Sequence, residues 1–208
     1  MMRKTLCIFC LAVGVVIPGF SQEITDGTFG IGDPRLIIKT AAGYNSWITE
    51  YMRNTSPGAG GFTGSVGVYY GSFPGIAVGA EIAYLPCYFG GYSPDWSTIY
   101  TIDLSFLPIS ANLYVSSGVY FLTLGIGYAP FIGKLQRTSG TGSLAANNFF
   151  FFRLESGFNI LTFGDIMISI GVDLDFPFSF MLTPFDNYTD ISFMEIQLSL
   201  KAGVTIVL

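Results

Sequence analysis

The feature that most constrains this chain is an alternation of apolar and polar residues that recurs along its length. In the last segment every second residue from 194 to 208 is apolar, and the residues between them are polar or small except Val207. Successive side chains of a β-strand point to opposite faces, so a period of two indicates a strand with one apolar and one polar face. One such strand fits many folds, and its repetition decides between them.

Seven earlier segments show the same alternation, separated by turn residues. They are 35–47, 62–70, 76–85, 99–115, 119–131, 149–160 and 166–176. In segment 99–115 the apolar phase shifts at Pro108. We therefore expect Phe106 to lie on the same outward face as Ile109, with a β-bulge at the proline absorbing the shift. With the last segment, these make eight predicted strands.

Composition disfavours two competing folds. Residues 54–80 and 104–133 carry no charge, as transmembrane helices would, but glycine, proline and serine interrupt both stretches. A soluble β-sandwich would also alternate, but it would need many charged outward positions. Only 11% of the residues are charged, against about 25% in ordinary soluble domains. The sequence therefore predicts an all-β chain whose apolar strand faces contact lipid.

The connections between the predicted strands alternate in length. The long ones are 45–61, 86–98, 132–148 and 177–190, and the short ones are 71–75, 116–118 and 161–165. This alternation is typical of bacterial outer-membrane barrels, which have short periplasmic turns and longer extracellular loops. We predict an eight-stranded antiparallel up-and-down transmembrane β-barrel with both chain ends on the periplasmic side.

Residues 1–21 have the layout of a secretory signal peptide. Arg3 and Lys4 precede the apolar run 6–17, and small residues stand before an expected cleavage site after Ser21. The run is shorter than the about 20 residues of a membrane anchor. We expect 22–208 to form a single barrel domain in the bacterial outer membrane. Two of the three cysteines lie in the signal, so Cys87 has no disulfide partner and no role is assigned to it.

Charged residues occupy inward positions of the predicted strands at similar heights above the periplasmic turns. Six are expected near one level: Lys39, Glu81, Arg153, Glu155, Asp173 and Lys201. An unpaired charge in a narrow interior costs several kcal/mol, so we predict an ion-pair network across the lumen. Three more are expected higher, as an acidic mouth that would favour cations in an open lumen: Asp103, Asp175 and Glu195.

The role of this network is left open by the sequence. It could close the lumen, since eight-stranded barrels are just wide enough to be filled by side chains. It could also act as a gate or selectivity filter, because small inward residues leave room for water or a slender ligand. These residues are Ala41, Gly43, Gly67, Ala77, Gly79, Gly125, Gly127, Gly157, Gly171 and Gly203.

Several function classes are disfavoured. The chain contains no histidine, which removes histidine-dependent nucleophile pairs and the usual zinc and haem sites. We expect no cofactor, no metal and no enzymatic activity. An acidic balance, with 9 basic against 14 acidic residues, argues against a nucleic-acid partner. The long connections, rich in glycine, serine, asparagine and aromatic residues, suit contact with a host or extracellular ligand.

The C-terminus resembles the terminal signal that marks outer-membrane barrels for the barrel-assembly machinery. Lys201, Gly203, Ile206 and Leu208 occupy its positions, with leucine in place of the usual terminal phenylalanine. With the alternation and the signal peptide, the chain resembles the small outer-membrane barrels typified by outer membrane proteins X and W and the barrel domain of protein A. The resemblance implies contact with outer-membrane lipid and with the assembly machinery.

Members of these families range from adhesion factors to narrow pores and lipid enzymes, so the resemblance does not choose a function. The lipid enzymes depend on histidine, which this chain lacks. Two hypotheses remain. The first is a largely closed barrel whose surface loops serve a structural or adhesion role. The alternative is a narrow porin-like channel for small or hydrophobic solutes.

Overall fold

The computed structural model describes residues 33–48, 60–92, 99–132, 145–146, 148–178, 180–183, 191–193 and 196–208. The predicted signal peptide, 1–21, lies outside these ranges, as do large parts of the long connections. Within the described ranges, no helix has both the length and the apolar character needed to cross a membrane.

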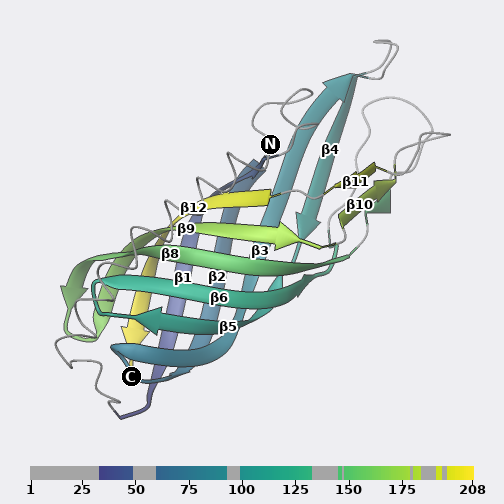
Figure 1. Cartoon of the computed structure of the whole chain (residues 1–208). Coiled ribbons are helices and arrows are strands. Elements are labelled where there is room, and N and C mark those ends of the chain that lie inside the picture. The colour runs from purple at the N-terminus through teal and green to yellow at the C-terminus, as the bar shows by residue number, and fades with distance from the viewer. Residues whose placement is uncertain are drawn as a thin grey trace, which may run out of the picture.

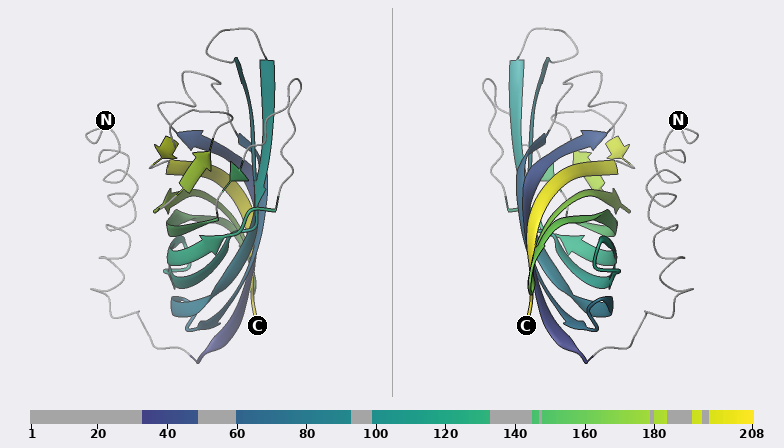
Figure 2. Two further views of the ribbon diagram at one scale, coloured as in Figure 1. Left: turned by 90° about the vertical axis from the view of Figure 1, so that its right-hand side faces the viewer. Right: turned by 90° about the vertical axis from the view of Figure 1, so that its left-hand side faces the viewer.

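Eight long antiparallel strands close into a barrel (Figure 1). They are β1 (Arg35–Ile48), β2 (Gly60–Gly71), β3 (Gly75–Tyr92), β5 (Ile109–Ser116), β6 (Tyr120–Ala129), β8 (Phe149–Phe163), β9 (Ile166–Pro177) and β12 (Ile196–Val207). Each pairs with the next of these strands along the chain, and β12 returns to pair with β1. Figure 2 shows the curved wall from two sides. The all-β, up-and-down barrel expected from the sequence is confirmed.

Four further strands lie toward the end of the barrel opposite the C-terminus (Figure 1). β4 (Ile99–Phe106) pairs with the distal part of β3, from Leu85 to Tyr92. The β3–β4 ribbon therefore rises beyond the other strands, as both views of Figure 2 show. β7 (Ala145–Ala146), β10 (Phe180–Thr183) and β11 (Ile191–Phe193) form a separate three-stranded sheet. The sequence gives no sign of this sheet, because β7 and β10 fall in expected loops.

The register around Pro108 corrects one expectation. Ile109 pairs with Ile82 and Phe106 pairs with Leu85, so the ladder passes through Pro108 with no inserted residue. The predicted β-bulge is wrong, because proline removes an N–H from the ladder without shifting the register. Phe106 is fully buried instead of facing lipid. Its ring packs on Phe131 and Phe149 inside the barrel, where the interior is aromatic rather than polar.

The outside of the barrel is apolar. Large hydrophobic side chains are exposed on every barrel strand, including Val68, Val78, Ile126, Ile170 and Leu200. An exposed ion pair, Arg35 with Asp165, lies at the end of the barrel near the C-terminus, with Nη1 and Oδ1 3.3 Å apart. A continuous apolar wall of this kind suits the hydrocarbon region of a membrane, because a closed barrel leaves no backbone edge unpaired.

Three levels of side chains fill the interior. Near the short turns lies an apolar cluster of Ile37, Tyr69, Ala77, Tyr114, Phe121, Met167 and Val207. Buried charged residues form the middle level. Toward the end with the long connections, Phe106, Phe149 and Phe151 are buried against one another. The middle level is the candidate site.

Candidate functional site

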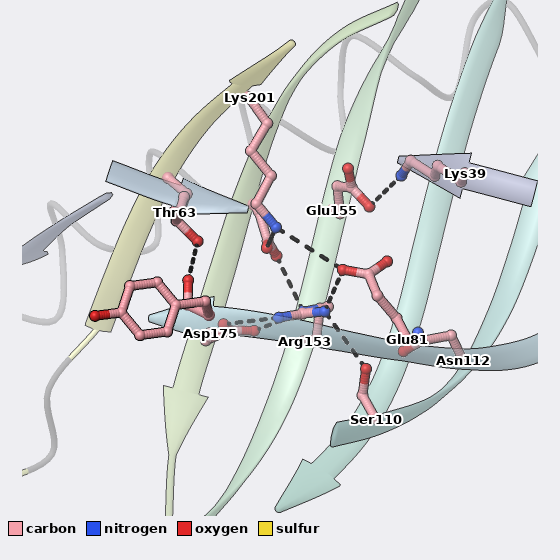
Figure 3. A network of polar contacts seen from close by, with 12 residues as sticks. Lys39, Thr63, Glu81, Ser110, Asn112, Arg153, Glu155, Asp175 and Lys201 are labelled. Carbon is pink, nitrogen blue, oxygen red and sulfur yellow. Dashed lines mark hydrogen bonds and ion pairs between the residues drawn. The ribbon is translucent and has the colours of Figure 1, made fainter. Parts of the chain in front are cut away.

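The middle level of the interior is a layer of buried charged side chains, which we call the charge layer. The six residues expected to form a network lie there, each at most 6% exposed: Lys39 on β1, Glu81 on β3, Arg153 and Glu155 on β8, Asp173 on β9 and Lys201 on β12. They point inward because strand alternation gives inward positions to one parity of residue. Figure 3 shows their side chains converging from separate parts of the wall.

Lys39 and Glu155 make one bridge across the lumen. The Lys39 ammonium donates to Glu155 Oε2, although β1 and β8 are not neighbours in the wall. The same ammonium lies 4.4 Å from the centre of the Phe121 ring. A cation so placed is attracted to the ring face, which partly compensates for its loss of water.

Arg153 is the hub of the charge layer (Figure 3). Its Nη1 donates to Glu81 Oε1 at 2.8 Å, a contact that crosses the lumen from β8 to β3. Its Nε and Nη2 donate to the two oxygens of Asp175, at 2.9 and 3.2 Å. The planar guanidinium suits this two-pronged contact with a carboxylate. Arg153 thus holds carboxylates on opposite sides of the interior.

Lys201 and Tyr69 complete the layer. The Lys201 ammonium donates to Asp173 Oδ2 on the neighbouring strand and lies 4.0 Å from Glu81 Oε1. The Tyr69 hydroxyl donates to Glu81 Oε2 at 3.0 Å. Glu81 therefore has partners from three strands, which fixes its carboxylate at the centre of the lumen.

The residues expected at an acidic mouth do not form one within the described chain. Asp175 is 4% exposed and belongs to the charge layer, because it is bonded to Arg153. Counting residues along each strand ignored the stagger between strands, which sets true heights in a barrel. Asp103 lies in β4, but its side chain is outside the described residues, as is that of Cys87 in β3. Glu195 lies outside them entirely.

Some of the small inward residues make room for aromatic rings. A Cβ at Gly67 would lie 2.7 Å from the Tyr69 ring, and one at Gly157 would lie 2.6 Å from the Phe121 ring. Tyr69 and Tyr114 pack with their ring centres 5.3 Å apart. The missing side chains are therefore replaced by rings from neighbouring positions. The expectation of spare room at these two glycines is wrong.

Sequence reasoning missed these rings. Tyr69 and Phe121 stand at inward positions where the alternation led us to expect polar or small residues. One sequence signal could have revealed them, namely a glycine that stands close along the chain to an aromatic residue of the same parity, as Gly67 does to Tyr69. A glycine in a strand often marks a place where other atoms approach the backbone closely.

The C-terminal residues take two different positions. Lys201 is buried in the charge layer, whereas Leu208 is 65% exposed at the end of the barrel. Gly203 pairs with Ala41 of β1 and with Ser169 of β9. Ile206 pairs with Ile38 at the closing seam. Their role as an assembly signal stays a prediction, because it concerns recognition before the barrel is closed.

Comparison with solved structures finds small outer-membrane barrels. Outer membrane protein AlkL, solved by solid-state NMR in lipid bilayers, is 15% identical with a TM-score of 0.51, covering 86% of this chain and 92% of that one. Neisserial surface protein A is 11% identical, with a TM-score of 0.49 and coverages of 82% and 96%. Ail of Yersinia pestis is 14% identical, with a TM-score of 0.48 and coverages of 82% and 99%.

No protein-family model matches the chain, and no curated protein matches its sequence. The likeness to AlkL shows that the chain shares the fold of small outer-membrane barrels, and it shows the fold alone. Function has to be argued from the charge layer, from the rings below it and from the end that carries the long connections.

Proposed function

We propose that this chain is a non-enzymatic outer-membrane barrel whose lumen is closed and whose extracellular end performs a structural or adhesion role. The observation that carries the proposal is the filled interior. The Arg153–Glu81 and Lys39–Glu155 bridges cross the lumen, and the Tyr69 and Phe121 rings occupy the level below them. Solutes would meet these obstructions in succession, along with the buried Phe106, Phe149 and Phe151 rings, so we assign any activity to the exterior.

The exterior supports a position in outer-membrane lipid. The wall presents a continuous apolar surface, and lipid is its natural partner. We propose delivery by the signal peptide 1–21 and assembly by the barrel-assembly machinery. In this orientation the turns beside the C-terminus face the periplasm, and the β3–β4 ribbon rises outside the cell.

The extracellular end offers a surface for contact. The β3–β4 ribbon extends past the other strands, and the sheet of β7, β10 and β11 lies at the same end of the barrel (Figure 1). Functional surfaces are commonly carried on loops held by a rigid scaffold. We propose that these segments contact a host or extracellular ligand.

Conductance tests the closed lumen. Residues 22–208 are refolded, folding is verified by the heat-dependent shift in gel mobility typical of barrels, and the protein is added to a planar bilayer. The proposal expects no discrete current steps from folded protein. Reproducible steps from folded wild type would contradict it.

Loop exchange tests the adhesion role. The four long connections are replaced by short turns in one variant, and the three short connections are replaced in a control. Cells displaying each protein are tested for binding to extracellular-matrix proteins and to host cells. We expect binding to be lost only in the first variant. Binding that persists after that exchange would contradict the adhesion role.

A second candidate is a channel for hydrophobic solutes that leave sideways through the wall, and one observation favours it. Pairing between β2 and β3 is interrupted between Gly60–Tyr88 and Gly64–Tyr84. Opposite the gap, Asn45 Nδ2 donates to the carbonyl of Pro86 and Asn45 Oδ1 accepts from Gly61 N–H, at 2.9 and 2.7 Å. Side-chain hydrogen bonds here replace the backbone ladder.

Uptake of a small apolar fluorescent probe by cells tests this candidate. Asn45→Ala loosens the interrupted seam and should increase uptake if solutes pass there. Asn159→Ala is the matched control, because Asn159 also bonds a backbone carbonyl, that of Gly118, but near the short turns. Equal uptake by both variants and wild type would contradict a lateral route for solutes.

A further inference from the structure

The positive and negative charges of the charge layer do not cancel. Among the residues that the structure describes, it contains three cations, Lys39, Arg153 and Lys201, and four carboxylates, Glu81, Glu155, Asp173 and Asp175. With every group ionised, the layer would carry a net charge of −1, from 3 − 4. An uncompensated charge is costly in a region shielded from water, and ionisable groups respond by becoming neutral.

The excess negative charge is concentrated on one pair of residues. Glu155 has Lys39 as its partner on the far strand. The other three carboxylates share two cations, since Arg153 contacts Glu81, Asp173 and Asp175, whereas Lys201 contacts Asp173 and Glu81. Asp175 has Arg153 alone among these cations. The shortage of positive charge is therefore greatest at Asp173 and Asp175.

The two aspartates approach the same atom. Asp175 Oδ1 lies 2.9 Å and Asp173 Oδ1 lies 3.4 Å from Arg153 Nε. Both side chains point inward from β9, two residues apart, so their carboxyl groups are neighbours. Asp173 Oδ1 is buried and accepts no hydrogen bond from any described residue. Two carboxylates in one buried place disfavour double ionisation.

We propose that Asp173 and Asp175 form a buried proton-binding site. Together they take up one proton from water at neutral pH, which makes the charge layer neutral overall. The proton converts one carboxylate into a donor, and the unsatisfied Asp173 Oδ1 gains a hydrogen bond. The ligand is thus a proton, held between two acidic side chains inside the barrel wall.

The charged and titratable side chains around this site are carried by most strands of the barrel. Among the described residues, the titratable or charged side chains that face the interior at this level and just below it are Lys39, Tyr69, Glu81, Tyr114, Arg153, Glu155 and Lys201. Glu81 adds negative charge near the pair, and Arg153 and Lys201 add positive charge. The positive groups reduce the charge of the pair, but they are shared with Glu81 and do not remove the surplus.

Infrared spectroscopy tests the site directly. Full-length mature protein is refolded into lipid vesicles at neutral pH, and the C=O stretching band of a protonated carboxyl group is measured. We expect the band in wild type and its loss in both Asp173→Asn and Asp175→Asn, because the layer then has three cations for three carboxylates. Asp165→Asn is the control, since Asp165 is exposed at the rim, and it should keep the band.

Stability provides a second readout. If the pair holds a proton, Asp175→Asn leaves the balance of charge unchanged, and the urea midpoint should stay close to that of wild type. Glu155→Gln leaves Lys39 without its charged partner, and the midpoint should fall. Absence of the band in folded wild type, or a band that survives both Asp173→Asn and Asp175→Asn, would overturn the proposal. If Asp175→Asn lowered the urea midpoint as much as Glu155→Gln does, the proposal would also be overturned.

Discussion

Lys39 and Glu155 stand 116 positions apart in the chain and form an ion pair through the interior of the barrel. Along the wall β12 and β9 separate their strands on one side, and β2, β3, β5 and β6 do so on the other. The contact therefore exists only once the sheet has closed. Lys201 also reaches across the interior, since its ammonium lies 4.0 Å from Glu81 Oε1 on β3, although its hydrogen bond to Asp173 is with the neighbouring strand β9. The first and last strands bring cations to carboxylates carried by the strands between them.

Removing Lys39 should destabilise the barrel strongly. Lys39→Met leaves Glu155 buried without its partner, and breaking a buried pair in this way costs about 3–5 kcal/mol. The loss is measured as the change in free energy of unfolding by urea from lipid vesicles, followed by tryptophan fluorescence.

The exposed pair at the rim is the control for Lys39. Arg35→Met removes the partner of Asp165, but both side chains are about half exposed or more. Exposed pairs contribute about 0–1 kcal/mol, so a small change is expected. Similar losses for Arg35→Met and Lys39→Met would contradict the importance of burial. The exchange Lys39→Glu with Glu155→Lys should recover part of the stability lost in Lys39→Met.

The fit between Gly67 and Tyr69 gives a second prediction. The nearest atoms to a Cβ at Gly67 all belong to the Tyr69 side chain, and the Tyr69 hydroxyl is held by Glu81. Gly67→Ala should therefore destabilise the barrel by about 1–3 kcal/mol through overpacking. In a Tyr69→Ala background the same substitution should cost little, and a double-mutant cycle measures the difference.

A glycine on the same strand serves as the control for Gly67. A Cβ at Gly64 would meet only the Ala41 carbonyl oxygen, at an ordinary 3.7 Å. Gly64→Ala should change the stability far less than Gly67→Ala does. Additivity of Gly67→Ala and Tyr69→Ala would show that the ring does not fill the space above this glycine.

The fold could be predicted because its physical signal is local. Alternation of apolar and polar residues depends only on the pleat of each strand, and the alternating connection lengths depend only on where turn residues stand. Phe106 shows where this reasoning fails. It was assigned to the lipid face because it is apolar, but the interior at its height is also apolar, so the parity of the strand was misread.

The candidate site could be predicted only in part, for a different reason. Inward parity identified every charged member of the charge layer, but the height of Asp175 was misjudged, so we placed it at the mouth. Height depends on the stagger between strands, and stagger is a property of the closed barrel rather than of any segment. Tyr69 and Phe121 were missed because ring and glycine meet only after the chain has folded.

Obstructions in series make a specific prediction about conductance. Arg153→Ala with Glu81→Ala removes one of the two bridges but leaves the Tyr69 and Phe121 rings in the lumen. Tyr69→Ala with Phe121→Ala removes these rings but leaves both bridges. We expect folded protein carrying either pair of substitutions to remain silent in planar bilayers, because the Lys39–Glu155 bridge and the buried Phe106, Phe149 and Phe151 rings stay in place. Steps from one pair alone would show that a single level closes the lumen.

The apolar wall predicts how the barrel responds to charge at two depths. Val68 and Val119 are similarly exposed, at 49% and 53%, but Val68 lies within β2 whereas Val119 lies in the turn before β6. Val119→Arg should lower the free energy of unfolding from vesicles by about 0–1 kcal/mol, the cost near the interface. Val68→Arg should lower it by more, toward the about 2–4 kcal/mol found at the bilayer midplane, because it places a cation in hydrocarbon. Urea titration of both variants in the same lipid measures the difference. Equal effects of the two substitutions would mean that β2 does not face hydrocarbon at Val68.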